Sequence, residues 1–324
     1  LAELYRRAGR RKQADATLER ALAQSPDHAP SFSLQGALAW EAGERDRAVA
    51  AWKRALELNP DDEKLANRLD FVSPEKKGPW AADIPDDAGL ERVVALREKL
   101  KRVPGADAAY LLDHEVTQLS HDGSTQNVVT LVMHALTADG RDRLTRQPIT
   151  GNGRVRILQS WAVDEKGRRS EASSERGRQV FFRGLTVGST TVLQYRLDAP
   201  PDGYLSRHLS KSWSFQGAAD QRVLSRFVLW LPKETRLHEE RVGEVRREEE
   251  VRGDSLRVVW SMGDTVPLTP EPNMPPAIES LANIKLSTIP DWDAWLSWEK
   301  ALLEGAFRTS PELDALARKL GEAK

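Results

Sequence analysis

The spacing of apolar residues changes twice along the chain. In residues 1–72, apolar and small residues recur every three or four positions, which is typical of amphipathic helices. From about residue 108 the period falls to two, which is typical of strands, beginning with the alternation of Tyr110, Leu112, His114 and Val116. Helical spacing returns after residue 290. The pattern therefore predicts helices, then a strand-rich region, then helices.

Two stretches of the helical region match each other at a spacing of 34 residues. The recurring positions are Gly9, Ala14, Leu18, Ala21 and Pro26 in the first copy, and Gly43, Ala48, Trp52, Ala55 and Pro60 in the second. A fixed period in the thirties, with small residues at set offsets, indicates stacked helical hairpins that bury their apolar faces on one another. Asp61 and Asp62 then signal a last helix, in which Leu65, Leu69 and Phe71 cover the exposed end.

Residues 73–103 read as a linker followed by a short helix, because proline and glycine are frequent before an apolar stripe that includes Leu90 and Leu100. Residues 104–289 are predicted to form an antiparallel β-sandwich. Turn signals such as Asp122-Gly123, Asp139-Gly140 and Gly253-Asp254 separate many short apolar runs there. Residues 263–290 are rich in proline and are predicted to lie extended over the surface.

Residues 290–324 are predicted to be helical and complete an α+β multidomain chain. Trp292, Trp295 and Trp298 share one broad helix face. Each buried indole removes on the order of 150–250 Å² from water. We therefore expect this face to pack against the sandwich or against a domain that follows.

The amino-acid composition argues against several classes of function. The 324 residues include 48 Lys and Arg and 49 Asp and Glu, and this balance argues against a nucleic-acid partner. The chain has no cysteine, which excludes disulfides, thiolate zinc sites and a cysteine nucleophile within it. No apolar run approaches the roughly 18 residues of a membrane span. The spacings of His114, His121 and His134 match no compact metal motif, so we expect no metal or cofactor.

The best candidate binding surface is the groove formed by the first helices of the two repeats. Its wall is predicted to display Glu3, Arg6, Arg7, Ser33, Ala37, Trp40 and Glu41. An exposed indole beside arginines can hold a peptide by stacking and by pairing with carboxylates. The alternative is that Trp40 packs against a preceding repeat or the linker.

The second repeat copy resembles a tetratricopeptide repeat. The matching positions are Phe32, Gly36, Ala39, Gly43, Ala48, Trp52, Ala55 and Pro60. The first copy begins in the middle of a helix. We therefore expect that the natural N-terminus is missing and that the two copies are the last units of a longer array.

The segment from Tyr110 to Trp298 resembles the bacterial domain of unknown function that commonly precedes transglutaminase-like domains. The matching pieces are His121-Asp122-Gly123-Ser124, the strand and turn at 157–167, residues 184–188 with Tyr195, Leu231-Pro232, residues 271–276, and Trp292, Trp295 and Trp298. In that family a papain-like core with a Cys, His, Asp triad follows the sandwich. No residue of this chain can be given a triad role, because it has no cysteine.

The two resemblances together imply a non-catalytic accessory region of a bacterial transglutaminase-like protein, in a periplasmic or other extracytoplasmic location. The repeats would recruit a protein or peptide, and the sandwich would position the catalytic domain near the three tryptophans. The alternative is a carbohydrate- or peptide-binding sandwich with an aromatic platform of Trp213, Phe215 and Tyr204. A concave cluster of exposed aromatic rings on the sandwich would favour the alternative, and burial of those rings would remove it.

Overall fold

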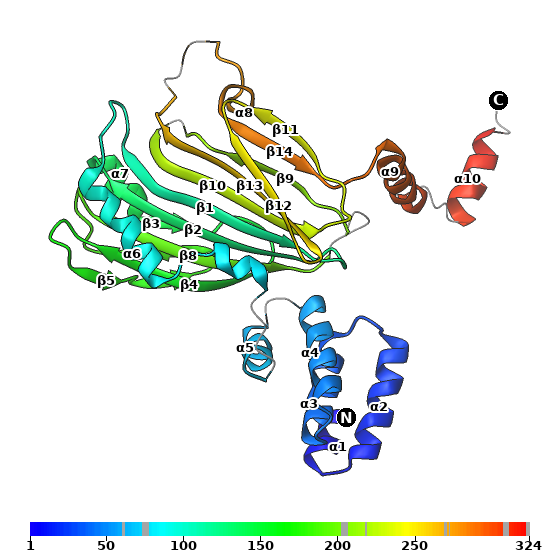
Figure 1. Cartoon of the computed structure of the whole chain (residues 1–324). Helices are drawn as coiled ribbons and strands as arrows, with labels where there is room; N and C mark the ends of the chain where they lie inside the picture. The colour runs from blue at the N-terminus through cyan, green and yellow to red at the C-terminus, as the bar shows by residue number, and fades with distance from the viewer. Residues whose placement is uncertain are drawn as a thin grey trace.

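The computed structural model describes residues 1–59, 62–72, 78–201, 207–217, 219–268, 271, 273–306 and 311–321. The chain is α+β, with a large mixed sheet and several helices (Figure 1). Helices of the N-terminal region lie to one side of the sheet, and the last two helices extend away from one end of it.

The N-terminal region consists of two helical hairpins and a further helix. These are α1 (Ala2–Arg7) with α2 (Arg11–Gln24), α3 (Ala29–Glu41) with α4 (Arg45–Leu58), and α5 (Glu63–Val72). The hairpin turns place Gly9 and Gly43 at φ 69° and 77°, a left-handed conformation that favours glycine. Pro60 and Asp61, predicted to end one helix and begin the next, lie outside the described residues, as does the side chain of Phe71.

Close approach of α3 to α4 depends on Gly36. A Cβ atom at this position would lie 2.3 Å from Trp52 Cδ1, so only glycine leaves room for the indole. Trp52 is 1% exposed, packs with Ala39, Ala48 and Leu65, and donates from Nε1 to the Ser33 carbonyl at 3.1 Å. The small residues of the repeat are therefore helix contacts, as the periodicity predicts.

An eight-stranded sheet forms the centre of the second region, in the order β12-β13-β10-β1-β2-β8-β4-β5. Its strands are β1 (Ala108–Leu119), β2 (Thr125–Ala135), β4 (Arg154–Val163), β5 (Arg169–Glu171), β8 (Thr190–Ala199), β10 (Asp220–Pro232), β12 (Arg246–Arg252) and β13 (Ser255–Thr265). The prediction of wholly antiparallel pairing is wrong for β1 and β10, which run parallel with Asp113 opposite Ser225. A period of two marks a strand but does not encode the direction of its partner.

Two three-stranded sheets cover parts of one face of the large sheet. One contains β9 (Ser210–Ser214), β14 (Asn283–Ser287) and β11 (His238–Val242), and its residues pack on Phe227, Leu229 and Trp260. The other contains β3 (Arg146–Pro148), β7 (Gln179–Phe181) and β6 (Ser174–Arg176), beside α7 (Ala138–Thr145). Phe182, which follows β7, packs with Leu193 of β8.

The opposite face of the large sheet is covered by residues of the segment predicted as a linker and a short helix. It contains the 3-10 helices η1 (Pro79–Asp83) and η2 (Leu96–Lys99) and, between them, α6 (Asp87–Ala95). Trp80 of η1 packs with Trp230 of β10, and Leu90 of α6 packs with Trp161 of β4. Residues 79–99 thus belong to the sheet region.

Two local predictions are also corrected. The proline-rich stretch contains α8 (Ala277–Ser280) and β14, and Ile284 of β14 is 0% exposed, so this part is core and not an extended surface segment. Asp139-Gly140 lies within α7 and not in a hairpin turn. A Cβ atom on Gly140 would come within 1.9 Å of the Asp107 carbonyl oxygen, so glycine is required by close backbone approach.

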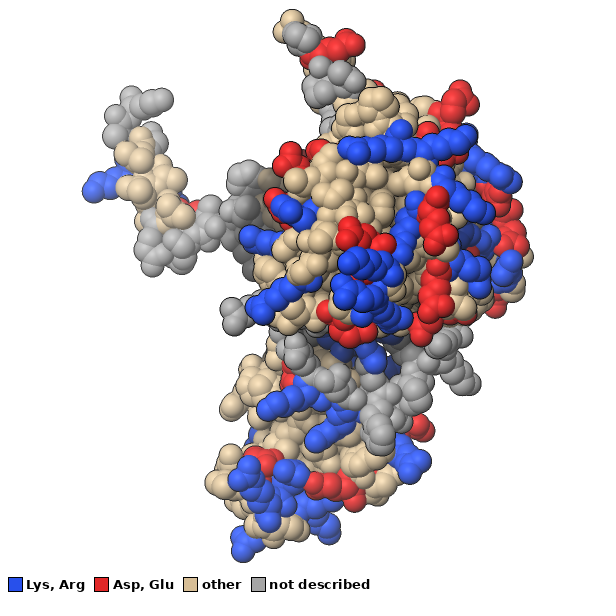
Figure 2. Space-filling view, turned by 90° about the vertical axis from the view of Figure 1, so that its left-hand side faces the viewer, with Lys and Arg blue, Asp and Glu red and all other residues tan. Residues whose placement is uncertain are grey.

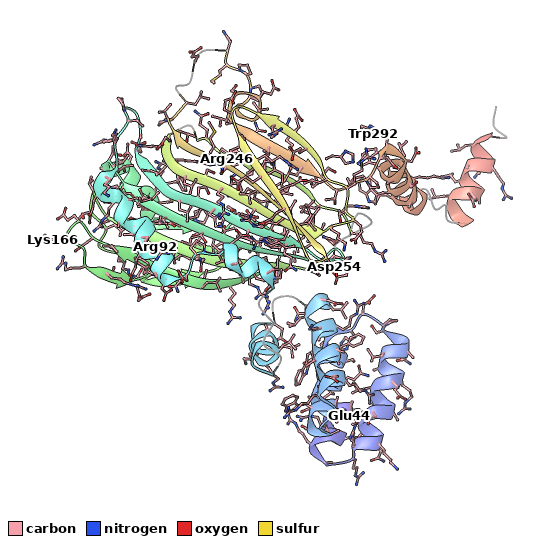
Figure 3. All side chains as sticks on the ribbon, in the orientation of Figure 1. Glu44, Arg92, Lys166, Arg246, Asp254 and Trp292 are labelled. Atoms are coloured by element: carbon pink, nitrogen blue, oxygen red, sulfur yellow. The ribbon has the colours of Figure 1, made fainter. Side chains whose placement is uncertain are left out.

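The chain ends in α9 (Trp292–Ala306) and α10 (Pro311–Gly321). Trp292, at the start of α9, is 75% exposed and so does not pack against the sheet (Figure 3). Its ring contacts Trp295 at a centroid distance of 5.8 Å, and Trp295 contacts Trp298 at 5.6 Å. Across the part of the chain that the structure describes, none of the helices is long and apolar enough to cross a membrane.

Candidate functional sites

A groove runs between the first helices of the hairpins and α5. Its volume is about 440 Å³, and four of the predicted residues line it: Glu3, Arg6, Ser33 and Ala37. Sequence reasoning missed Asn59, Asp62, Leu65 and Arg68, which line its other wall. These residues lie at the end of α4 and in and before α5. Helical periodicity does not specify how α5 packs against the preceding helices, so it does not predict that they line the groove.

Ion pairs hold the polar end of this groove. Arg6 donates from Nε and Nη2 to the two Glu3 oxygens, each at 2.8 Å, and also pairs with Glu41. Arg7 donates to Glu3 Oε1 at 2.9 Å. Hydrogen bonds from Arg6 and Arg7 lower the pKa of Glu3 to about 2, so this carboxylate stays ionised.

Trp40 does not line the groove. It is 37% exposed, its ring lies 5.7 Å from the Trp52 ring, and the Arg45 guanidinium lies 5.7 Å from its centroid. In these ring contacts the indole lies against α4, the second helix of its own hairpin, and against neither the preceding repeat nor the linker. The groove gathers four of the seven predicted residues, with Arg7 and Glu41 joined to it through ion pairs.

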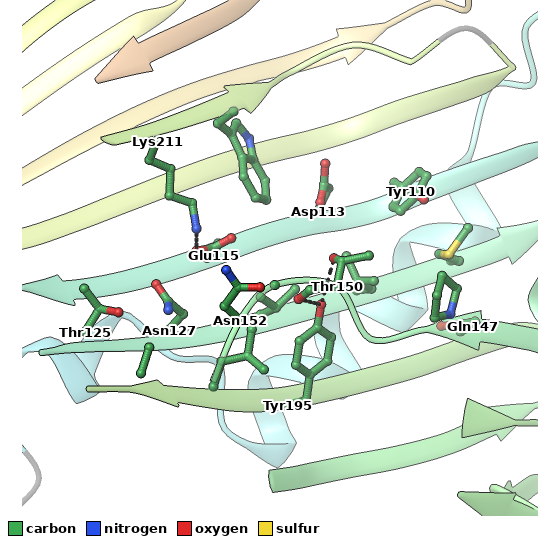
Figure 4. A pocket seen from close by; sticks show the side chains of 18 of the residues that line it. Tyr110, Asp113, Glu115, Thr125, Asn127, Gln147, Thr150, Asn152, Tyr195 and Lys211 are labelled. Atoms are coloured by element: carbon green, nitrogen blue, oxygen red, sulfur yellow. Dashed lines mark hydrogen bonds and ion pairs between the residues drawn. The ribbon is translucent and has the colours of Figure 1, made fainter. Parts of the chain in front are cut away.

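A second hollow, here called the sheet cavity, lies on the large sheet between the two small sheets (Figure 4). Its volume is about 620 Å³. The apolar lining includes Val129, Leu131 and Met133 of β2 and Tyr195 and Leu197 of β8. The polar lining includes Asp113, Glu115, Asn127, Arg143, Arg146, Gln147, Asn152, Lys211 and Arg222.

Among the described residues, Asp113 of β1 is one of two buried carboxyl groups that line the sheet cavity. It accepts from Arg222 Nη1 at 2.6 Å and from Ser225 Oγ at 3.3 Å. Burial raises its pKa to about 6, although Arg222 and Ser225 act in the opposite direction. The Arg222 guanidinium also lies 5.2 Å from the centre of the Tyr110 ring.

Glu115, two residues further along β1, projects from the same face. It forms an ion pair with Lys211 of β9, and Thr117 Oγ1 lies 2.8 Å from its Oε1. Across the cavity the Tyr195 hydroxyl lies 3.4 Å from Thr150 Oγ1. Each cavity carboxylate is thus matched by one cation, which is the usual condition for burying charge.

Two of the three rings of the alternative aromatic platform lie in different surroundings. Phe215 is 0% exposed and packs under the small sheet, whereas Trp213 lies in the cavity wall and donates to Ser225 Oγ at 3.1 Å. Tyr204 lies outside the described residues. Burial of Phe215 therefore removes that ring from the platform, and Trp213 lies in a concave surface.

Two of the histidines singled out in the sequence lie in strands of the large sheet. His114 is 1% exposed, with Nε2 lying 2.9 Å from the Asp83 carbonyl oxygen, while His134 Nδ1 contacts Thr190 Oγ1. Burial lowers the pKa of His114 to about 4. In the described ranges, no three His, Asp or Glu side chains are grouped so as to hold a metal ion.

The charged surface shows the same balance as the composition. In Figure 2, basic and acidic side chains are interspersed over the visible end of the sheet region. Pairs such as Arg143 with Asp220 and Arg168 with Asp164 account for part of this mixing.

Comparison with known proteins gives a likeness of fold. No family model and no curated protein matches the chain. A putative protease from Parabacteroides distasonis is similar over 58% of this chain, with a TM-score of 0.52 and 18% identity. An M1 zinc metallopeptidase from Deinococcus radiodurans matches over 56%, but its TM-score of 0.31 is too low to support an inference. The chain spans 41% of the length of the putative protease.

Proposed function

We propose that this chain is a non-catalytic accessory and protein-interaction region of a bacterial transglutaminase-like protein. In this proposal the helical hairpins are tetratricopeptide repeats that recruit a protein or peptide partner. The sheet region, interpreted as the β-sandwich that precedes such catalytic domains, positions the catalytic domain. The whole protein would act outside the cytoplasm.

The groove between the hairpins and α5 is the observation that carries the proposal. Its opposite walls combine polar groups with apolar surface: Arg6 and Glu3 on one side, and Leu65 and Arg68 on the other. Such a mixture suits a short peptide, which needs both side-chain contact and pairing for its polar groups. Absence of cysteine supports the non-catalytic part, because the resembled enzymes use a cysteine nucleophile.

The three indoles of α9 support the positioning role. Trp292 is largely exposed, and Leu296 and Leu302 on the same helix are each 51% exposed. A helix with this much exposed apolar surface is typical of an element that packs against another domain. The proposed neighbour is the downstream catalytic domain.

Peptide selection on the immobilised chain, followed by fluorescence anisotropy with the selected peptide, tests recruitment. Ala37→Trp places a large ring in the groove and should weaken binding at least tenfold. Arg20→Ala, on the exposed side of α2, is the matched control and should leave binding unchanged. Circular dichroism establishes that both variants keep their helices.

The proposal fails if no peptide is selected, or if the selected peptide binds the Ala37→Trp variant as well as the parent chain. Hydrolase or acyl-transfer turnover by the purified chain, abolished by a substitution within it, would contradict the non-catalytic role.

A further inference from the structure

We infer that the sheet cavity is a binding site for a small organic carboxylate with an apolar body. The carboxylate could be supplied by the C-terminus of a short apolar peptide or by a free aliphatic acid. This site is separate from the repeat groove, and the inference does not depend on the proposed function.

The shape and floor of the cavity favour a small apolar body. At about 620 Å³ it falls within the range of roughly 300–1,000 Å³ that small-molecule sites occupy. Val129 and Leu131 of β2 form the floor with Leu197 of the neighbouring β8. Trp213 of β9 adds an aromatic surface on the opposite side.

The charged side chains that line the cavity favour an acid as ligand. Arg143, Arg146 and Arg222 all line the cavity, and Tyr110 and Met133 share that lining. Arg222 is paired with Asp113, and Arg143 is paired with Asp220 at 2.6 Å. Two of the three arginines are therefore paired with a carboxylate of the described residues, and the third is not.

Arg146 supplies the unneutralised charge. Its Nε donates to the neutral Gln179 amide oxygen at 2.8 Å, and among the described residues no carboxylate is paired with it. A guanidinium that keeps free N–H groups can hold a carboxylate through two parallel hydrogen bonds. Arg222, which lines the same cavity, has its Nε buried without a hydrogen-bond partner among the described residues.

The interior charges explain why an acid is preferred to a base. Asp113 and Glu115 are already paired with Arg222 and Lys211, so neither is available to an incoming cation. Asn127 and Asn152 line the cavity as neutral polar groups, able to bond an amide or hydroxyl. The expected ligand thus has an acid at one end and tolerates a neutral polar group elsewhere.

Isothermal titration of the full chain tests the inference with two carboxylates, decanoate and N-acetyl-trileucine. The matched uncharged or cationic probes are decanol, the C-terminal amide of the peptide and decyltrimethylammonium. We expect at least one carboxylate to bind at or below 1 mM, and at least tenfold more tightly than its matched probe. The decanoate and peptide arms distinguish the two sources of the acid.

Two variants and a control locate the binding. Arg146→Ala removes the unneutralised guanidinium at an exposed position and should weaken binding about tenfold or more. Leu131→Trp fills the floor and should abolish it. Arg246→Ala, on the exposed strand β12, removes the same charge outside the cavity and should have no effect.

The inference is overturned if neither carboxylate binds at 1 mM, if the amide or the cation binds equally well, or if binding persists unchanged in both Arg146→Ala and Leu131→Trp.

Discussion

Removing the Asp83 carboxylate should destabilise the sheet region more than any change of an exposed ion pair. Asp83, at the end of η1, accepts from Arg257 at 2.5 and 2.8 Å, from Arg226 at 3.0 Å and from Trp230 Nε1 at 2.9 Å. Its side chain is 7% exposed. It therefore fixes η1 to β10 and β13 through groups that have little access to water.

The expected loss in the free energy of unfolding follows from the arginine charges that remain after the substitution. Asp83→Ala leaves Arg257 and Arg226 partly buried beside an empty acceptor position. Breaking a buried pair by removing one partner typically costs about 3–5 kcal/mol. Glu250→Ala removes the other partner of Arg257, but Glu250 is 39% exposed, so we expect a loss of less than about 1 kcal/mol.

Urea unfolding followed by tryptophan fluorescence provides the assay. With a slope near 3 kcal/mol/M, the expected loss lowers the midpoint of Asp83→Ala by about 1 M or more. Hydrogen bonds from Arg257 and Trp230 outweigh burial and lower the pKa of Asp83 to about 2. Its stabilising contribution should therefore be present above pH 3.8 and disappear as the pH falls toward 2. Equal midpoints for Asp83→Ala and Glu250→Ala would refute this account.

Two further predictions concern packing and pH. Gly36→Ala should destabilise the helical hairpins by about 1–3 kcal/mol, because the added Cβ would lie 2.3 Å from Trp52. A thermal melt of the helical dichroism, with Gln35→Ala as control, checks this, and an unchanged or higher midpoint would contradict it. Asp113, whose pKa is raised to about 6 in the fold, costs stability when ionised, so its contribution to stability rises as the pH falls from 6 toward 3.8. On acidification from pH 7 to 4, the parent chain should therefore gain about 2–3 kcal/mol relative to Asp113→Asn in urea unfolding. A difference that does not vary with pH would show that burial does not raise this pKa.

The helical region illustrates how much a repeat pattern can predict. The positions of Gly9, Gly43 and Trp52 in the pattern predict turns and a helix contact, and all three predictions agree with the structure. Helix-face geometry also placed Ser33 and Ala37 in the groove. Trp40 was misplaced because helical periodicity does not specify which neighbouring helix a partly exposed ring will contact.

The sheet cavity was not predicted, although its residues are visible in the sequence. Asp113 and Glu115 occupy alternate positions along β1, separated by His114 and flanked by Leu112 and Val116, a pattern that is typical of the solvent side of a strand. Their cations, Arg222 and Lys211, come from strands about 100 residues further along the chain. The only local indication of the cavity was that two alternate positions of one strand, Asp113 and Glu115, carry carboxyl groups able to form ion pairs.

The sequence by itself determined the order of helices and strands, the hairpin register of the repeat, the overall charge balance and the exclusion of cysteine chemistry. These features follow from local periodicity and composition. Tertiary structure decided the parallel pairing of β1 with β10, the burial of the segment around Asp83, and the meeting of Asp113 with Arg222. Each of these joins segments distant in sequence, so it depends on packing and burial that no local pattern records.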